Sequence, residues 1–202
     1  DRAVLPYYRE LECHGPFIGY NGSIILDPDD KKFPVFKKKY PLTIIKDFLS
    51  HFKIDDFSNI MAEDEKNLFF LYEDHEYENY FHPEGMNVFY GPMLELFKED
   101  LFGFIISLKD PNLLFKVQDV ISKYDDIGFR PWINTSLIGE FFFYSVNKST
   151  AIERLQKYYQ IDRAHVIAFG DADNDIEMIK KAGVSFAMQN GSEVIKKVAD
   201  YI

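Results

Sequence analysis

Cysteine is almost absent from this chain of 202 residues, because Cys13 is the only one. A single cysteine cannot form an internal disulfide, which excludes a small disulfide-stapled scaffold and makes a reducing, cytoplasmic setting the expected one. No histidine signature accompanies Cys13. We therefore expect it to be a small buried apolar residue and not a nucleophile.

Long hydrophobic runs are also missing. Apolar stretches such as residues 141–144 have only the length of a strand, whereas a membrane-spanning helix needs about 18–20 apolar residues. No membrane partner is expected. The hydrophobic content of 47% is that of an ordinary globular protein. At roughly 150 residues per domain, the length predicts one large domain or one domain that carries an insertion.

Positive charge is scarce, with 23 Lys and Arg against 33 Asp and Glu and a net charge of -10. Nucleic-acid binding needs a basic surface, so nucleic acid is not an expected partner. A small phosphorylated metabolite needs only a local positive site and stays compatible with this balance. The Lys-, Phe- and Tyr-rich composition is typical of AT-rich coding sequences and hints at a bacterial source. A monomer or a weak homodimer is expected.

The clearest pattern lies in residues 148–202. Residues 166–169 form an apolar run that ends in Gly-Asp, which is typical of a buried parallel strand entering a loop. Apolar residues at helical spacing predict helices at 150–159, 176–182 and 192–199. A second apolar run predicts a strand at 184–188. This alternation predicts a parallel sheet covered by helices.

The rest of the chain is expected to hold two kinds of structure. Near the N-terminus we expect a helix at 4–11 and a hairpin of strands 16–20 and 23–26, because Asn21-Gly22 between apolar runs is a strong hairpin signal. The middle predicts a separate α+β module, with helices at 41–52, 91–101 and 113–124 and strands at 57–63, 68–73, 104–108, 132–135 and 141–146. The acidic segment 73–84 contains two histidines too far apart for one helical face, so a solvated loop is favoured over a metal site.

Residues 170–177 carry the candidate chemistry. Asp171, Asp173, Asn174 and Asp175 fall within five residues where a strand ends and a helix begins. Ligands bind at this edge of open α/β sheets, and a hard divalent cation such as Mg²⁺ would relieve the repulsion between carboxylates. A calcium loop of the EF-hand type is excluded, because it needs a glycine at the position of Ile176. A helix cap with a solvated first turn stays an open alternative.

These motifs resemble the end of a Cof-type, class IIB hydrolase of the haloacid dehalogenase superfamily. The family pattern is a lysine opening a helix, a strand ending in Gly-Asp-x-x-Asn-Asp, then Met, Ala-Gly-Val and Ala-Met-x-Asn. The matching residues here are Lys148, residues 166–175, Met178, residues 182–184, residues 187–190 and residues 198–200. Residues 6–8 and 20–22 resemble the segment that precedes the cap in the same family. Between these parts no resemblance is found.

The resemblance implies an α/β fold, in which a Rossmann-like core with helices on both faces of a parallel sheet carries an inserted α+β cap. The core would comprise residues 1–32 and 142–202, and the cap residues 33–141. It also implies a Mg²⁺-dependent phosphatase for small phosphate monoesters, with sugar phosphates as the leading class. In the family, an aspartate nucleophile forms an aspartyl-phosphate, a covalent route that splits one hard displacement into two steps.

The resemblance also implies roles for particular residues. Asp171 and Asp175 would hold the metal, and Lys148 and Asp175 would be catalytic. Lys148 would also bind the phosphoryl group as a point charge, together with Asn174 and Asn21. These roles have plain alternatives. Lys148 could be a surface lysine, Asn174 a polar residue in the first turn of a helix, and Asn21 part of a simple hairpin turn.

Two departures from the family pattern stand out. Ser149 follows Lys148 where the family usually has glycine, and no Asp-x-Asp-Gly motif occurs in the sequence. We therefore expect these 202 residues to be part of a longer enzyme and to be inactive alone. A non-catalytic protein that binds a phosphorylated ligand and a structural domain with a solvated acidic loop are the alternatives.

Overall fold

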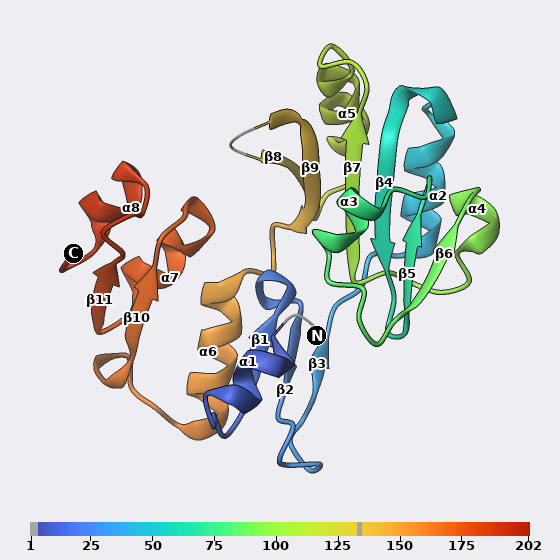
Figure 1. Cartoon of the computed structure of the whole chain (residues 1–202). Coiled ribbons are helices and arrows are strands. Elements are labelled where there is room, and N and C mark those ends of the chain that lie inside the picture. Colours follow the sequence, from blue (N-terminus) through green and yellow to red (C-terminus); the bar gives the residue numbers. More distant parts are fainter. Residues whose placement is uncertain (1–3, 133–134) are drawn as a thin grey trace. The chain divides into compact units, whose positions relative to one another are not determined.

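The computed structural model describes residues 4–132 and 135–202, and it divides the chain into two compact units (Figure 1). Unit 1 comprises Asp1–Gly15 and Lys37–Tyr144, and unit 2 comprises Pro16–Phe36 and Ser145–Ile202. Residues 1–32 were expected to group with residues 142–202, and residues 33–141 to form the other unit. In the structure residues 16–36 group with residues 145–202, whereas residues 1–15 and 142–144 fall in unit 1.

Unit 1 is built on a six-stranded sheet with the strand order β6-β5-β4-β7-β9-β8. The β5–β6 pair is parallel, and the other neighbours are antiparallel. In chain order the strands are β4 (Phe57–Glu63), β5 (Asn67–Phe70), β6 (Asn87–Tyr90), β7 (Gly103–Leu108), β8 (Ile127–Trp132) and β9 (Thr135–Phe143). The helices of the unit are α1 (Leu5–Glu10), α2 (Leu42–Ser50), α3 (His75–Asn79), α4 (Met93–Leu96) and α5 (Leu113–Ile121).

Helices cover both faces of this sheet. Phe48 of α2 stacks edge-on against Phe104 of β7 and Phe141 of β9. Ile105, the next residue of β7, points to the other face because side chains alternate along a strand. There it packs against the same buried cluster as Tyr77 of α3. The α2 contact follows from its sequence, in which Ile45, Phe48 and Leu49 recur at helical spacing and are all buried.

Unit 2 combines a hairpin sheet with an αβαβα segment. Strands β1 (Phe17–Gly19), β2 (Ile24–Leu26) and β3 (Phe36–Lys37) form one sheet, and η1 (Tyr20–Gly22) links the first two. The hairpin packs on α6 (Lys148–Tyr159) through Ile25, Phe33 and Ala151. The parallel strands β10 (Ile167–Gly170) and β11 (Val184–Ala187) pack on α7 (Ile176–Lys181) and α8 (Glu193–Val198).

Most of the elements expected in the middle of the chain are found, but not all. The prediction of a helix at 91–101 is wrong, because only the single turn of α4 forms there. Residues 87–90, for which no element was expected, form β6, which pairs with β5 and stacks Phe89 on Phe69. The strands expected at 132–135 and 141–146 are shifted, since β8 ends at Trp132 and β9 already ends at Phe143. Residues 133–134 of the first lie outside the described residues.

The acidic segment 73–84 is not the solvated loop that the sequence predicted. Asp74 caps α3 by accepting hydrogen bonds from the backbone N–H groups of Glu76 and Tyr77, both at 3.1 Å. The Glu78 side chain is only 7% exposed and accepts a hydrogen bond from the Tyr90 hydroxyl at 2.9 Å. Burial raises the pKa of Glu78, but hydrogen bonds from Tyr90 and the Asp74 backbone outweigh it and leave the pKa below its usual value.

Cys13 is exposed, so the expectation of a buried apolar residue is wrong. The segment 11–14 around it is exposed throughout. Among the helices in the described parts of the chain, none is both long enough and apolar enough to cross a bilayer.

Candidate active site

The candidate site of unit 2 starts from the tight turn between β10 and α7. The strand ends at Gly170, a short helical turn covers Asp173–Asp175, and α7 follows. A Cβ atom on Gly170 would lie 2.6 Å from the Cβ of Asp175. Glycine at this position therefore lets the Asp175 side chain fold back beneath the end of the strand, where it is 4% exposed.

Both carboxylate oxygens of Asp175 accept hydrogen bonds from the protein. Oδ2 accepts from the backbone N–H groups of Asp171 at 3.1 Å and Ala172 at 3.2 Å. Oδ1 accepts from Nζ of Lys148 at 2.5 Å. Burial raises the pKa of Asp175, but the lysine and the two backbone donors outweigh it and hold the pKa below its usual value. Asp175 is thus an ionised carboxylate paired with an ammonium group.

Lys148 is held in place by the start of α6. Asn147 caps this helix, since its Oδ1 accepts from the Thr150 backbone N–H at 3.0 Å and its own N–H donates to Thr150 Oγ1 at 2.9 Å. Lys148 is the first residue of the helix, and its side chain is 33% exposed. Ser149, where the family usually has glycine, is 2% exposed, and its hydroxyl has no hydrogen-bond partner in the described part of the chain.

The hairpin of unit 2 brings a third segment to the site. Asn21 lies in the turn between β1 and β2, and its Oδ1 accepts a hydrogen bond from Nδ2 of Asn174 at 3.0 Å. Gly22 packs against the backbone of Asn147, where a Cβ atom would lie 2.4 Å from the Asn147 carbonyl oxygen. The hairpin turn therefore touches both the cap of the lysine helix and the aspartate-rich turn.

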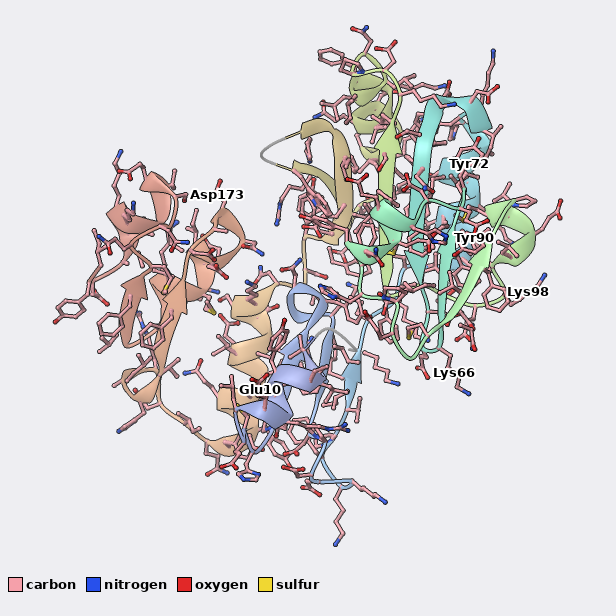
Figure 2. The ribbon with its side chains drawn as sticks, viewed as in Figure 1. Glu10, Lys66, Tyr72, Tyr90, Lys98 and Asp173 are labelled. Atoms are coloured by element: carbon pink, nitrogen blue, oxygen red, sulfur yellow. The ribbon has the colours of Figure 1, made fainter. Side chains whose placement is uncertain are left out.

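These side chains border a cavity of about 480 Å³ within unit 2. Its polar lining consists of Asn21, Lys148, Asp171 and Asp175, and its apolar lining includes Ile152 and Phe169. Asn174 contacts the cavity residue Asn21 without lining the cavity itself. Asp173 does not line it either. Figure 2 labels Asp173, whose carboxylate accepts a hydrogen bond from the Ser192 hydroxyl at 3.0 Å.

The residues fit a magnesium ion only in part. Asp171 is exposed and lines the cavity, and its carboxylate has no hydrogen-bond partner among the described residues. Asp175, in contrast, already uses both oxygens for protein donors. Over residues 4–132 and 135–202, no group of three or more His, Cys, Asp or Glu side chains is arranged to hold a metal. One carboxylate fits Mg²⁺, because this ion usually binds one or two carboxylates and keeps several waters.

The structure brings together every residue that the sequence singled out, namely Asn21, Lys148, Asp171, Asn174 and Asp175, within unit 2. Their clustering was predicted, and their chemical roles stay predictions. Sequence reasoning missed that Gly22 and Gly170 make two of these contacts possible by leaving room for a neighbouring backbone or side chain. The only sequence signal was the presence of glycine beside each polar residue.

Comparisons with known proteins agree with this geometry. The model of the haloacid dehalogenase-like hydrolase family matches residues 1–202. The 5-amino-6-(5-phospho-D-ribitylamino)uracil phosphatase YitU of Bacillus subtilis is 28% identical over 202 residues, which cover 98% of this chain and 74% of YitU. A phosphatase of the same name, YbjI of Escherichia coli, is 45% identical over 56 residues, or 28% of this chain and 21% of YbjI.

Solved structures show the same fold. A haloacid dehalogenase-like hydrolase from Bacteroides thetaiotaomicron superposes with a TM-score of 0.82 at 23% identity, over 100% of this chain and 76% of that one. A subclass IIB sugar phosphatase of the superfamily superposes with a TM-score of 0.74 at 16% identity, over 98% and 73% of the two chains. The expected α/β fold with a class IIB insertion is confirmed. The chain belongs to the haloacid dehalogenase-like hydrolase family.

Proposed function

We propose that the protein hydrolyses small phosphate monoesters with Mg²⁺, through an aspartyl-phosphate. The observation that carries the proposal is the placement of Lys148, paired with Asp175, on the same cavity as the unpaired carboxylate of Asp171. A lysine and, beside its partner Asp175, a further carboxylate on one cavity of a strongly acidic protein suit a phosphate and a divalent cation. A purely structural acidic turn would need neither the lysine nor the cavity.

Lys148 has the chemistry to bind the phosphoryl group. Its ammonium has three donors, and Asp175 takes one of them. The remaining donors can stabilise negative charge on phosphoryl oxygens as that charge develops. Asp175 fixes the position of the ammonium. Asn21 lines the same cavity, and its side-chain oxygen already accepts a hydrogen bond from Asn174.

Asp171 would be the protein's carboxylate ligand for the metal, and Asn174 an additional oxygen ligand or a contact to the phosphate. When bound, Mg²⁺ would neutralise the negative charges of an attacking carboxylate and of the phosphoryl oxygens, which otherwise repel each other. Asp175 was predicted as a second ligand. Because both of its oxygens accept hydrogen bonds from the protein, we assign it the positioning of Lys148 in this proposal.

The attacking carboxylate is proposed to come from a strand outside residues 1–202. Among the described residues, β10 pairs with β11 alone, so its other edge is open for a further strand. Ile167 and Phe169 on β10 are 62% and 61% exposed, and such a strand would bring apolar partners for them. A nucleophile at the end of that strand would lie beside Asp171 and the cavity.

Sugar or polyol phosphates are the proposed substrate class. YitU and YbjI carry names that describe a phosphorylated ribityl compound, and a phosphoglycolate phosphatase of Methanosarcina acetivorans is 37% identical over 57 residues. All three names describe a small phosphorylated compound. A cavity of about 480 Å³ accommodates a phosphate together with a few further atoms.

The test is phosphate release by the full-length protein from an aryl phosphate and a panel of sugar and polyol phosphates, with Mg²⁺ and with a chelator. We expect turnover that the chelator abolishes and that added Mg²⁺ restores. Binding of a phosphorylated compound without any turnover would favour the non-catalytic alternative. Neither binding nor turnover would reject the proposal.

A further inference from the structure

The hairpin turn of unit 2 has a left-handed backbone at three consecutive residues. The φ angles are +48° at Tyr20, +52° at Asn21 and +108° at Gly22. Positive φ is uncommon for residues other than glycine, and for a bulky residue such as tyrosine it is strained. Strain of this kind persists only where the surrounding structure imposes it, and it clusters at functional sites.

Two contacts of this turn show what the strained conformation achieves. Gly22 approaches the carbonyl of Asn147 so closely that no side chain would fit, which seats the turn on the residue just before Lys148. At the same time Asn21 reaches the side chain of Asn174, at a separation of 3.0 Å between Oδ1 and Nδ2. An ordinary hairpin turn needs neither contact.

The Asn21–Asn174 hydrogen bond has a definite direction. Asn174 donates and Asn21 accepts, and neither side chain has another hydrogen-bond partner in the described part of the chain. An asparagine amide carries its oxygen and its nitrogen on opposite sides of one carbon. While Nδ2 of Asn174 is held by the hairpin, its Oδ1 faces away from the hairpin, and the Asn174 amide can turn over only if the Asn21 amide turns over with it.

We propose that Asn21 is a positioning residue, whose side-chain oxygen holds Nδ2 of Asn174 so that Asn174 turns its Oδ1, and not an N–H group, away from the hairpin. The strained turn exists to hold Asn21 in this place against the start of α6. The effect of Asn21 on catalysis rests on the proposed function. The hydrogen bond that holds the Asn174 amide is independent of it.

The direct test is nuclear magnetic resonance of the Asn174 side-chain amide in the full-length protein. Asn21→Gly is the variant of choice, because glycine keeps the left-handed backbone and removes only the side chain. We expect the Asn174 amide protons to move to the positions of a solvent-exposed amide in Asn21→Gly. In Asn21→Asp, which retains an acceptor, they should keep the wild-type positions.

Unit 1 offers a matched control. There Asn87 donates to Asn67 through the same pair of amide atoms, at 3.1 Å. Asn87→Ala removes an amide pair of the same kind and should leave the Asn174 signals unchanged. Unchanged Asn174 signals in Asn21→Gly would overturn the proposal, whether or not the protein proves to be a phosphatase.

Phosphate release then separates positioning from direct phosphate binding. Loss of groups that orient a ligand typically costs about 10- to 100-fold in activity or metal affinity. We expect Asn21→Gly and Asn174→Ala each to lower kcat by about 10-fold and the double variant to lose little more, because the two residues act as one device. Asn21→Asp should recover most of the activity. If Asn21 bound phosphate directly, Asn21→Asp would be worse than Asn21→Gly, and that outcome, or additive losses, would overturn the assignment.

Discussion

Gly22→Ala is the substitution that probes the packing of the site most sharply. A Cβ atom at this position would lie 2.4 Å from the carbonyl oxygen of Asn147, 2.7 Å from its carbon and 3.3 Å from its Cα. All three are backbone atoms, so no flexible side chain can move out of the way. The residue also has φ of +108°, which an L-residue adopts only at a cost.

The expected loss combines two effects. An alanine with a left-handed backbone costs roughly 1–2 kcal/mol, and overpacking a tight contact costs roughly 1–3 kcal/mol. We therefore expect Gly22→Ala to lower the free energy of unfolding by about 2–5 kcal/mol. Urea unfolding monitored by circular dichroism measures the total, and hydrogen exchange at the Ala151 backbone N–H, which bonds to the Asn147 carbonyl, reports the loss locally.

Gly91→Ala is the matched control. Gly91 has φ of +126°, and a Cβ atom there would meet nothing within 4 Å. Gly91→Ala therefore strains the backbone without creating a steric clash, so the difference between the two losses in the free energy of unfolding measures the clash with Asn147. If Gly22→Ala destabilises the protein no more than Gly91→Ala does, the reasoning is refuted.

Three further predictions follow from the same contacts. Lys148→Met leaves the buried Asp175 carboxylate without its ammonium partner and should cost about 1–3 kcal/mol in the free energy of unfolding; adding Asp175→Asn should recover part of this loss, and strictly additive losses would contradict the pairing. Because the pKa of Asp175 is lowered on folding, its contribution to stability is complete above about pH 4 and is lost as the pH falls through the folded-state pKa. Between neutral and acidic pH, the free energy of unfolding should fall more steeply for the wild type than for Asp175→Asn. Equal pH dependence in the two proteins would contradict the lowered pKa of Asp175. Ser149→Ala removes a buried hydroxyl that has no partner in the described chain and should raise the melting temperature; a decrease would mean that the hydroxyl is bonded after all.

The C-terminal αβαβα segment could be predicted from sequence because its signals are local. The apolar run 166–169, the helical spacing that follows it and Ser192 as a helix cap are each readable within a few residues, and the structure contains all three elements. The strand is not the buried one that was expected, because Ile167 and Phe169 are exposed. The short β6 was missed for the opposite reason. Residues 87–90 form a strand because they pair with β5, about 20 residues earlier, and no local pattern reports this pairing.

The candidate site shows the same limit at the level of single atoms. The motif placed Asp175 near a cation, and the structure supplies one in Lys148, which lies 27 residues earlier in the chain. Sequence spacing cannot tell whether such a carboxylate meets an ammonium group or a metal ion. Likewise, Asn21 and Asn174 are 153 residues apart, and their hydrogen bond follows from the fold of unit 2 alone.

The central claim is that Asp171 and Lys148 form a phosphate and metal site on the unit 2 cavity. The most direct measurement compares Asp171→Asn with Asp173→Asn in the full-length protein, by phosphate release as a function of Mg²⁺ concentration. Asp171 lines the cavity, whereas Asp173 bonds to Ser192 and does not line it. We expect Asp171→Asn to abolish Mg²⁺-dependent turnover and Asp173→Asn to retain it. Equal turnover by the two variants would contradict the account.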